Sequence, residues 1–124
     1  MAVTTGTTWD ILLNDEPTTR LDPHGSVSAR AAYQAALYDR AVLVDLRSAR
    51  RRSHDGELPA GLSVAVVDRL ELGVWLRESL AARVLLLDDD GDRAGRLAAS
   101  AGPRLAAVAG GFAGWRAAGL PVAS

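Results

Sequence analysis

The stretch Arg83-Val-Leu-Leu-Leu-Asp-Asp-Asp-Gly-Asp-Arg-Ala-Gly-Arg96 decides the fold, because it predicts a strand, a tight loop and a helix in direct succession. Residues 84–87 form an uninterrupted apolar run, which is typical of a strand buried on both faces of a parallel sheet. Gly91 permits a left-handed turn, and the apolar spacing beyond it is helical until Gly102 and Pro103 end it. A loop that follows a parallel strand lies at the carboxyl edge of the sheet, where open α/β sheets bind their ligands.

The rest of the chain repeats this alternation of strand and helix. We predict further strands over residues 41–46, 63–67 and 105–108, and a short edge strand or turn over 21–23. We predict helices that end near residue 39, over 70–82, from 93 to 101 and over 112–118, with Ser26 or Ser28 as the N-cap of the first. The alternation predicts an α/β fold whose mostly parallel central sheet carries helices on both faces.

Length and composition limit the other possibilities. A chain of 124 residues makes one domain, which we place at residues 21–124 behind a partly ordered extension, residues 1–20. A net charge of −1 gives no general attraction to nucleic acid or to an anionic membrane. The absence of cysteine removes disulfides, thiolate metal sites and thiol nucleophiles together. No apolar run approaches about 18 residues and no signal peptide is present, so we expect a cytoplasmic protein.

Three motifs occur in a defined order. They are Val-Leu-Val-Asp-Leu-Arg at 42–47, Gly-Glu-Leu-Pro-Ala-Gly at 56–61, and Val-Ala-Gly-Gly-Phe-Ala-Gly-Trp-Arg-Ala-Ala-Gly-Leu-Pro at 108–121. The first resembles the hhhDxR strand end of the rhodanese-homology family of sulfurtransferase-like domains. The second stands, with departures, where that family has a Gly-His-Ile-Pro-Gly-Ala type of loop, and the third is similar to its C-terminal GG…W…GLP signature. The resemblance covers roughly residues 21–122 and implies a single rhodanese-like domain.

The chain departs from this family at the functional centre. The family's active loop is Cys-x-x-Gly-x-Arg, and the same frame here contains Asp88, Asp89, Asp90, Gly91, Asp92 and Arg93. The family's chemistry needs a thiolate that takes up a sulfane sulfur as a persulfide, and a carboxylate cannot replace it. The resemblance therefore implies a vestigial loop without sulfurtransferase activity. The neighbouring acids should also raise the pKa of any thiol placed at position 88.

A binding or regulatory module is the function that these departures favour. We expect a protein or a small ligand to meet the loop edge of the sheet, and we expect no cofactor and no metal. The candidate ligand contacts are Arg47, Glu57 and Arg93. Arg47 and Arg93 should also face fixed carboxylates, namely Asp45 and the loop acids respectively. The sequence does not predict the oligomeric state.

The acidic loop also permits a different function. Asp88, Asp90 and Gly91 resemble the first motif of the haloacid-dehalogenase phosphatases, so the alternative is a metal-dependent hydrolytic or phosphoryl-transfer enzyme that uses residues 88–92. The lysine of those enzymes is absent, as is that of response-regulator receivers, which have a similar acidic strand end. The acids leave open weak binding of Mg²⁺ or Ca²⁺. The simplest interpretation is that the carboxylates accept N–H groups of the loop and helix, with Asp92 as the N-cap.

Overall fold

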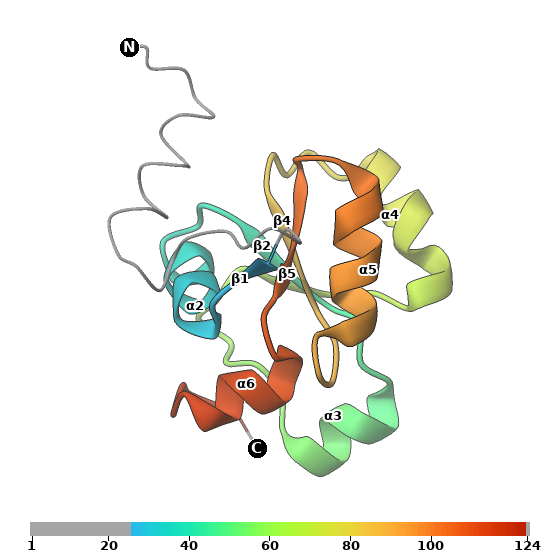
Figure 1. The fold of residues 1–124 in the computed structure, drawn as a ribbon. Coiled ribbons are helices and arrows are strands. Elements are labelled where there is room, and N and C mark those ends of the chain that lie inside the picture. The colour runs from blue at the N-terminus through green and yellow to red at the C-terminus, as the bar shows by residue number, and fades with distance from the viewer. Residues whose placement is uncertain (1–25, 124) are drawn as a thin grey trace.

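A parallel sheet of five strands runs through the middle of the computed structural model, which describes residues 26–123 (Figure 1). The strands are β1 (Ser26–Val27), β2 (Val42–Asp45), β3 (Val64–Val66), β4 (Val84–Leu87) and β5 (Leu105–Val108). Their spatial order is β1-β5-β4-β2-β3, so the predicted buried strand β4 is central and β1 and β3 form the two edges. The predicted α/β class and the parallel sheet are confirmed.

Helices cover both faces of this sheet. They are α2 (Ala29–Leu37), α3 (Ala49–Asp55), the 3₁₀ turn η2 (Arg69–Glu71), α4 (Leu72–Glu78), α5 (Asp92–Ala101) and α6 (Gly111–Ala117). Figure 1 shows α2 and α6 on one face of the sheet and α4 and α5 on the other. Helix α3 lies beyond the carboxyl ends of the strands. The fold is thus the predicted single layer of strands between two layers of helices.

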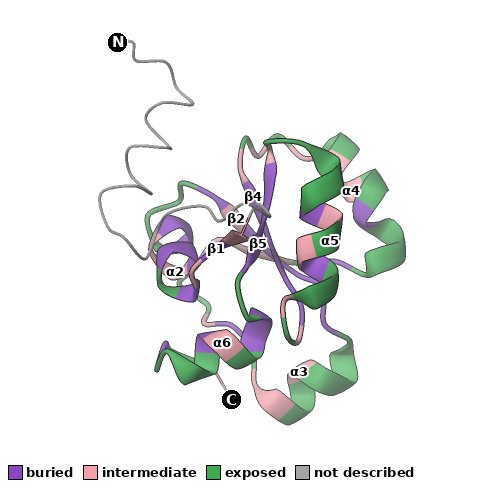
Figure 2. Cartoon of the chain, viewed as in Figure 1, coloured by how far each residue is buried: buried purple, intermediate pink, exposed green. Residues whose placement is uncertain are grey.

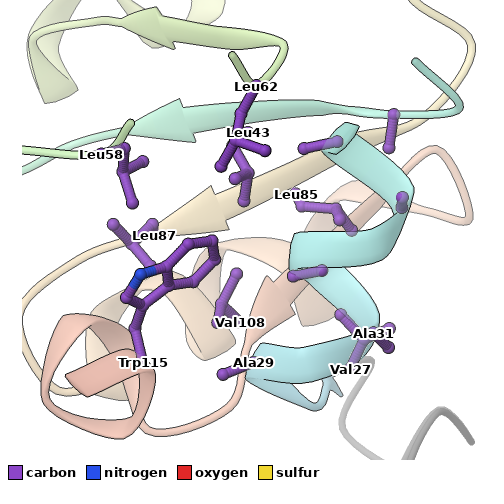
Figure 3. Packing of buried hydrophobic residues seen from close by; sticks show 14 of the residues in the cluster. Val27, Ala29, Ala31, Leu43, Leu58, Leu62, Leu85, Leu87, Val108 and Trp115 are labelled. Atoms are coloured by element: carbon purple, nitrogen blue, oxygen red, sulfur yellow. The ribbon is translucent and has the colours of Figure 1, made fainter. Parts of the chain in front are cut away.

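Alternating side chains of β4 supply both halves of the core. Leu85 and Leu87 pack toward α2 and α6, whereas Val84 and Leu86 pack toward α4 and α5. All four side chains are buried (Figure 2), because a central parallel strand covered on both faces has no solvated side. Figure 3 shows that Trp115 of α6 packs close to Leu87 and Val108, in the half of the core that lies toward α2 and α6.

The carboxyl ends of three neighbouring strands lie level with one another. Asp45 at the end of β2 is in register with Leu87 of β4 on one side and with Val66 of β3 on the other. The segments that follow these three strands therefore leave the sheet at one place. This register assembles the candidate site.

Two predicted helices differ in detail from the structure. Ser28, and not Ser26, is the N-cap of α2, because its hydroxyl accepts the N–H of Ala31 while Ser26 lies in β1. The helix predicted over 70–82 begins as a 3₁₀ turn and ends at Glu78. Around this end, the guanidinium of Arg104 donates to the carbonyls of Leu76, Ser79 and Ala81 at 2.8–3.0 Å, so helix-end carbonyls have a partner without a further helical turn.

Some predictions fall on residues that the structure does not describe. The edge strand or turn over 21–23 and the extension over 1–20 lie outside the described residues, so the domain boundary at residue 21 stays a prediction. Within residues 26–123, no helix is both long and apolar enough to cross a membrane.

Candidate functional site

A cleft of about 820 Å³ opens at the carboxyl edge of the sheet. Its walls are the segments that follow β2, β3 and β4. The lining residues are Leu46, Arg47, Ser48, Ala49, Arg52, Val66, Val67, Asp68, Arg69, Leu70, Asp88, Asp89, Asp90, Asp92, Arg93 and Arg96. The structure thus brings the predicted loop and two of the three predicted ligand contacts to one cleft.

The carboxylate of Asp88 is turned into the protein and not toward a ligand. Its Oδ1 accepts the N–H of Gly91 at 2.6 Å, and its Oδ2 accepts the N–H of Ala94 at 2.9 Å. The residue is only 9% exposed. Because these N–H groups belong to the loop and the first turn of α5, the negative charge lies at the positive end of a helix and caps it.

The helix cap differs from the predicted one. Gly91, in the left-handed conformation at φ 88°, occupies the N-cap position without a side-chain hydrogen bond, and Asp92 is already inside the helix. Asp90 turns back to accept the N–H of Asp92 at 2.9 Å. The loop acids therefore do accept loop and helix amides, but Asp88 and Asp90 do so in place of Asp92.

The beginning of α6 holds the acidic loop in this shape. Phe112 and Ala113 donate their N–H groups to the carbonyls of Asp88 and Asp89, at 2.8 and 3.1 Å. A Cβ on Gly111 would lie 2.6 Å from the carbonyl oxygen of Asp88, so only glycine permits the approach. The glycine pair of the C-terminal motif thus packs directly on the loop.

Arginines outside the predicted set form ion pairs with two of the loop acids. Arg51 of α3 places Nε 3.3 Å from Asp89 and 3.5 Å from Asp55. Arg96 pairs with Asp92 at 2.8 Å, one turn along α5. Helix α3 is consequently joined to the active-loop position by an ion pair, although such exposed pairs contribute only about 0–1 kcal/mol each.

Arg47 lines the cleft but is bound to the protein itself. Its side chain is fully buried, and Nε and Nη2 meet the two carboxylate oxygens of Asp45 at 3.0 and 2.8 Å. The guanidinium carbon lies 3.7 Å from the centroid of the Phe112 ring, and Nη1 has no hydrogen-bond partner among the described residues. This burial weighs against the predicted role of Arg47 as a ligand contact.

Glu57 lies away from the cleft. Its backbone exchanges two hydrogen bonds with Ala123, and its carboxylate is 3.5 Å from Nε of Arg52. It lines a separate depression of about 490 Å³ together with His54 and Val122. The three predicted ligand contacts are therefore not grouped in one place.

His54 and Asp55 form a hydrogen-bonded pair at the end of α3. Nδ1 of His54 donates to Oδ1 of Asp55 at 2.7 Å. This bond lowers the pKa of the Asp55 carboxyl from its ordinary value, the positive charge of Arg51 lowers it further, and partial burial opposes both effects.

Arg93 is the predicted ligand contact that stays available. Its side chain is exposed in the cleft and makes no hydrogen bond or ion pair with any residue of the described part. Arg69, just after β3, is likewise exposed in the cleft and has no side-chain partner in the described part. Neither Arg69 nor Leu70, which also lines the cleft, was among the residues predicted from the sequence. The available signal was positional, since both residues follow a strand whose carboxyl end meets the same edge.

The described residues contain no preformed set of metal ligands. No group of three or more histidine, aspartate or glutamate side chains in residues 26–123 is arranged to hold an ion. The chemistry that the cleft can offer through its unpaired side chains is recognition by exposed guanidinium groups.

The fold has counterparts among solved structures. A protein of unknown function from Rhodopseudomonas palustris, described as a possible tyrosine phosphatase, is 20% identical, with a TM-score of 0.61 over 98% of this chain and 96% of that one. A protein from Lactobacillus plantarum is 18% identical, with a TM-score of 0.60 over 81% of this chain and 88% of that one. A rhodanese-related protein from Thermoplasma volcanium is 21% identical, with a TM-score of 0.59 over 78% of this chain and 95% of that one.

These identities show the fold alone. No protein-family model matches the chain, and no curated protein matches it. The chain folds as a rhodanese-like domain, as its three motifs predicted.

Proposed function

We propose that this rhodanese-like domain performs no sulfur transfer and acts as a binding module through the cleft at the carboxyl edge of its sheet. The observation that carries the proposal is the buried carboxylate of Asp88, held by the N–H groups of Gly91 and Ala94. Those amides are the donors with which the loop could stabilise a reacting anion. Here they are already occupied by the protein's own side chain.

The carboxylate of Asp88 has the same number of bonds from Cβ to its outer atoms as a cysteine persulfide. An aspartate oxygen is separated from Cβ by one atom, as is the outer sulfur of a cysteine persulfide. Asp88 therefore places a permanent negative charge where the sulfur-loaded side chain of an active relative would carry a transient one. A carboxylate oxygen cannot be transferred as sulfane sulfur can, so the loop keeps its charged shape without turnover.

The alternative of a metal-dependent hydrolytic or phosphoryl-transfer enzyme gains no specific support. Its first aspartate would have to attack phosphorus or bind the ion, but both oxygens of Asp88 accept backbone amides. The Rhodopseudomonas palustris protein is described as a possible tyrosine phosphatase. Phosphoryl transfer through a cysteine nucleophile is not open to a chain that has no cysteine.

Two measurements test the proposal. Cyanide-dependent turnover of thiosulfate by the wild-type chain should not exceed that of a heat-killed control, and turnover above it would overturn the proposal. For the binding role, the wild-type chain, Arg93→Glu and Arg30→Glu serve as baits. A partner that the wild type and Arg30→Glu retain and Arg93→Glu loses supports binding at the cleft, because Arg30 is an exposed arginine of α2 outside it.

A further inference from the structure

The outer edge of β3 carries unpaired backbone groups. Leu43 of β2 donates its N–H to the carbonyl of Ser63, and Val67 donates to the carbonyl of Asp45. Because strand residues alternate in direction, the N–H and C=O groups of Val64 and Val66 point away from β2. β3 is last in the sheet order, and no described strand pairs with that side.

Apolar side chains accompany this open edge. Val66 is 54% exposed and Leu70, four residues later, is 94% exposed. Natural edge strands are usually protected by charged residues, proline or a covering segment, whereas β3 has the sequence Val-Ala-Val. An uncovered apolar edge is the structure to which extended peptides add as an extra strand.

The cleft continues from this edge and contains two exposed guanidinium groups. Val66 and Leu70 line the cleft together with Arg69 and Arg93, two exposed arginines of the cleft whose side chains have no partner among the described residues. Each acid of the cleft has a contact within the protein. Asp88 and Asp90 accept loop amides, Asp68 accepts the N–H of Leu70, and Asp89 and Asp92 are paired with Arg51 and Arg96. The guanidinium groups of Arg69 and Arg93 are therefore available to bind carboxylates of a partner.

We infer that the cleft receives an extended segment of another protein that contains apolar and acidic side chains. The segment adds to the edge of β3 by hydrogen bonds with Val64 and Val66. Its apolar side chains cover Val66 and Leu70, and its carboxylates meet Arg69 and Arg93. This inference rests on the proposed binding function and names the class of its partner.

The probe is a blocked hexapeptide of alternating valine and glutamate, added to the full-length ¹⁵N-labelled chain. We expect it to shift the amide signals of Val64 and Val66, and to bind at least about tenfold more tightly than its valine–lysine counterpart. A version N-methylated at the residues that face β3 should lose binding, because it keeps the side chains but lacks the strand hydrogen bonds. Equal binding of the N-methylated peptide, or no binding of any, overturns the inference.

Protein variants provide the second arm. The double variant Arg69→Gln/Arg93→Gln should weaken binding about tenfold or more, while Arg30→Gln leaves it unchanged. In the free chain, the amides of Val64 and Val66 should exchange rapidly with deuterium. Slow exchange that fades on dilution would show a second copy at the edge, and slow exchange independent of concentration would show the chain's own covering segment. Both results overturn the inference, and neither affects the expected absence of thiosulfate turnover.

Discussion

Arg47 and Asp45 form a bidentate ion pair that is sealed from solvent, with side chains 0% and 1% exposed. The pair lies at the end of β2, and the ring of Phe112 in α6 stacks on its guanidinium. The backbone N–H of Arg47 also donates to Asp45 at 3.1 Å. The turn that leaves β2 is thus fixed by both main chain and side chain, and it positions one wall of the cleft.

Removing the cation from this pair should destabilise the protein strongly. We expect Arg47→Ala to lower the free energy of unfolding by about 3–5 kcal/mol, because it leaves the Asp45 carboxylate buried and unpaired. Arg50→Ala is the control, since this arginine is exposed on α3, and its effect should stay within about 0.5 kcal/mol. Urea unfolding midpoints measure both. Equal losses at the two positions would contradict the structural role of Arg47.

The contact between the glycine pair and the acidic loop makes a second prediction. Gly111→Ala should cost at least about 2 kcal/mol, because φ is 59° and the new Cβ would lie 2.6 Å from three backbone atoms of the loop. Gly95→Ala, within α5 and with open space around it, should instead stabilise the helix by about 0.5–1 kcal/mol. Thermal and urea unfolding should show changes in stability of opposite sign for the two variants. An unchanged stability of Gly111→Ala would show that the loop can shift to accommodate the methyl group.

Local pattern accounts for the parts of the structure that the sequence predicted. The four-residue apolar run of β4 and the strand-helix alternation have simple periodicities, so the sheet and its two helical layers follow from them. The pairing of Arg47 with Asp45 was also predictable, because residues two apart at a strand end can meet. Arg93 lines the same cleft as the loop acids, but Arg51 and Arg96 form the ion pairs with Asp89 and Asp92.

Long-range placement accounts for what the sequence could not predict. Arg51 is 38 residues from Asp89 along the chain, and only the shared carboxyl edge of β2 and β4 brings them together. The exposure of Leu70 depends on β3 being the edge strand, and strand order is not written in the pattern of any one segment. The position of Glu57 could not be predicted for the same reason. It was expected near the loop, but in the structure it lines a separate depression.

Asp55 should give the stability a dependence on pH in the acid range. Its folded pKa lies below its ordinary value of 3.8, chiefly because His54 donates a hydrogen bond to the carboxylate. A lowered folded pKa adds stability that is present above the unfolded pKa and is lost as pH falls through the folded one. The difference in urea midpoint between wild type and Asp55→Asn should therefore be constant near neutrality and shrink below pH 3.8. A difference that persists at lower pH would contradict this origin.

The environment of position 88 argues against an expectation drawn from the sequence. Three neighbouring acids suggested that a thiol placed there would have a raised pKa. In the structure, Asp89 and Asp92 are paired with arginines, and Asp90 is turned to an amide. The amides of Gly91 and Ala94, meanwhile, point at the position 88 side chain from the start of α5. Amides at a helix start favour an anion beside them, and we expect this effect to exceed that of the exposed, screened charges.

We therefore expect Asp88→Cys to give a thiol whose pKa lies below the ordinary value of about 8.5, as at other helix N-termini. The pH dependence of alkylation by iodoacetamide measures it. Adding Arg51→Gln should raise the thiol pKa, because Asp89 then loses the cation that screens it. Adding Arg50→Gln should not, since Arg50 has no part in that ion pair. A single variant that titrates at or above about 8.5 would show that the amides no longer reach the shorter cysteine side chain, and that the acids control the loop after all.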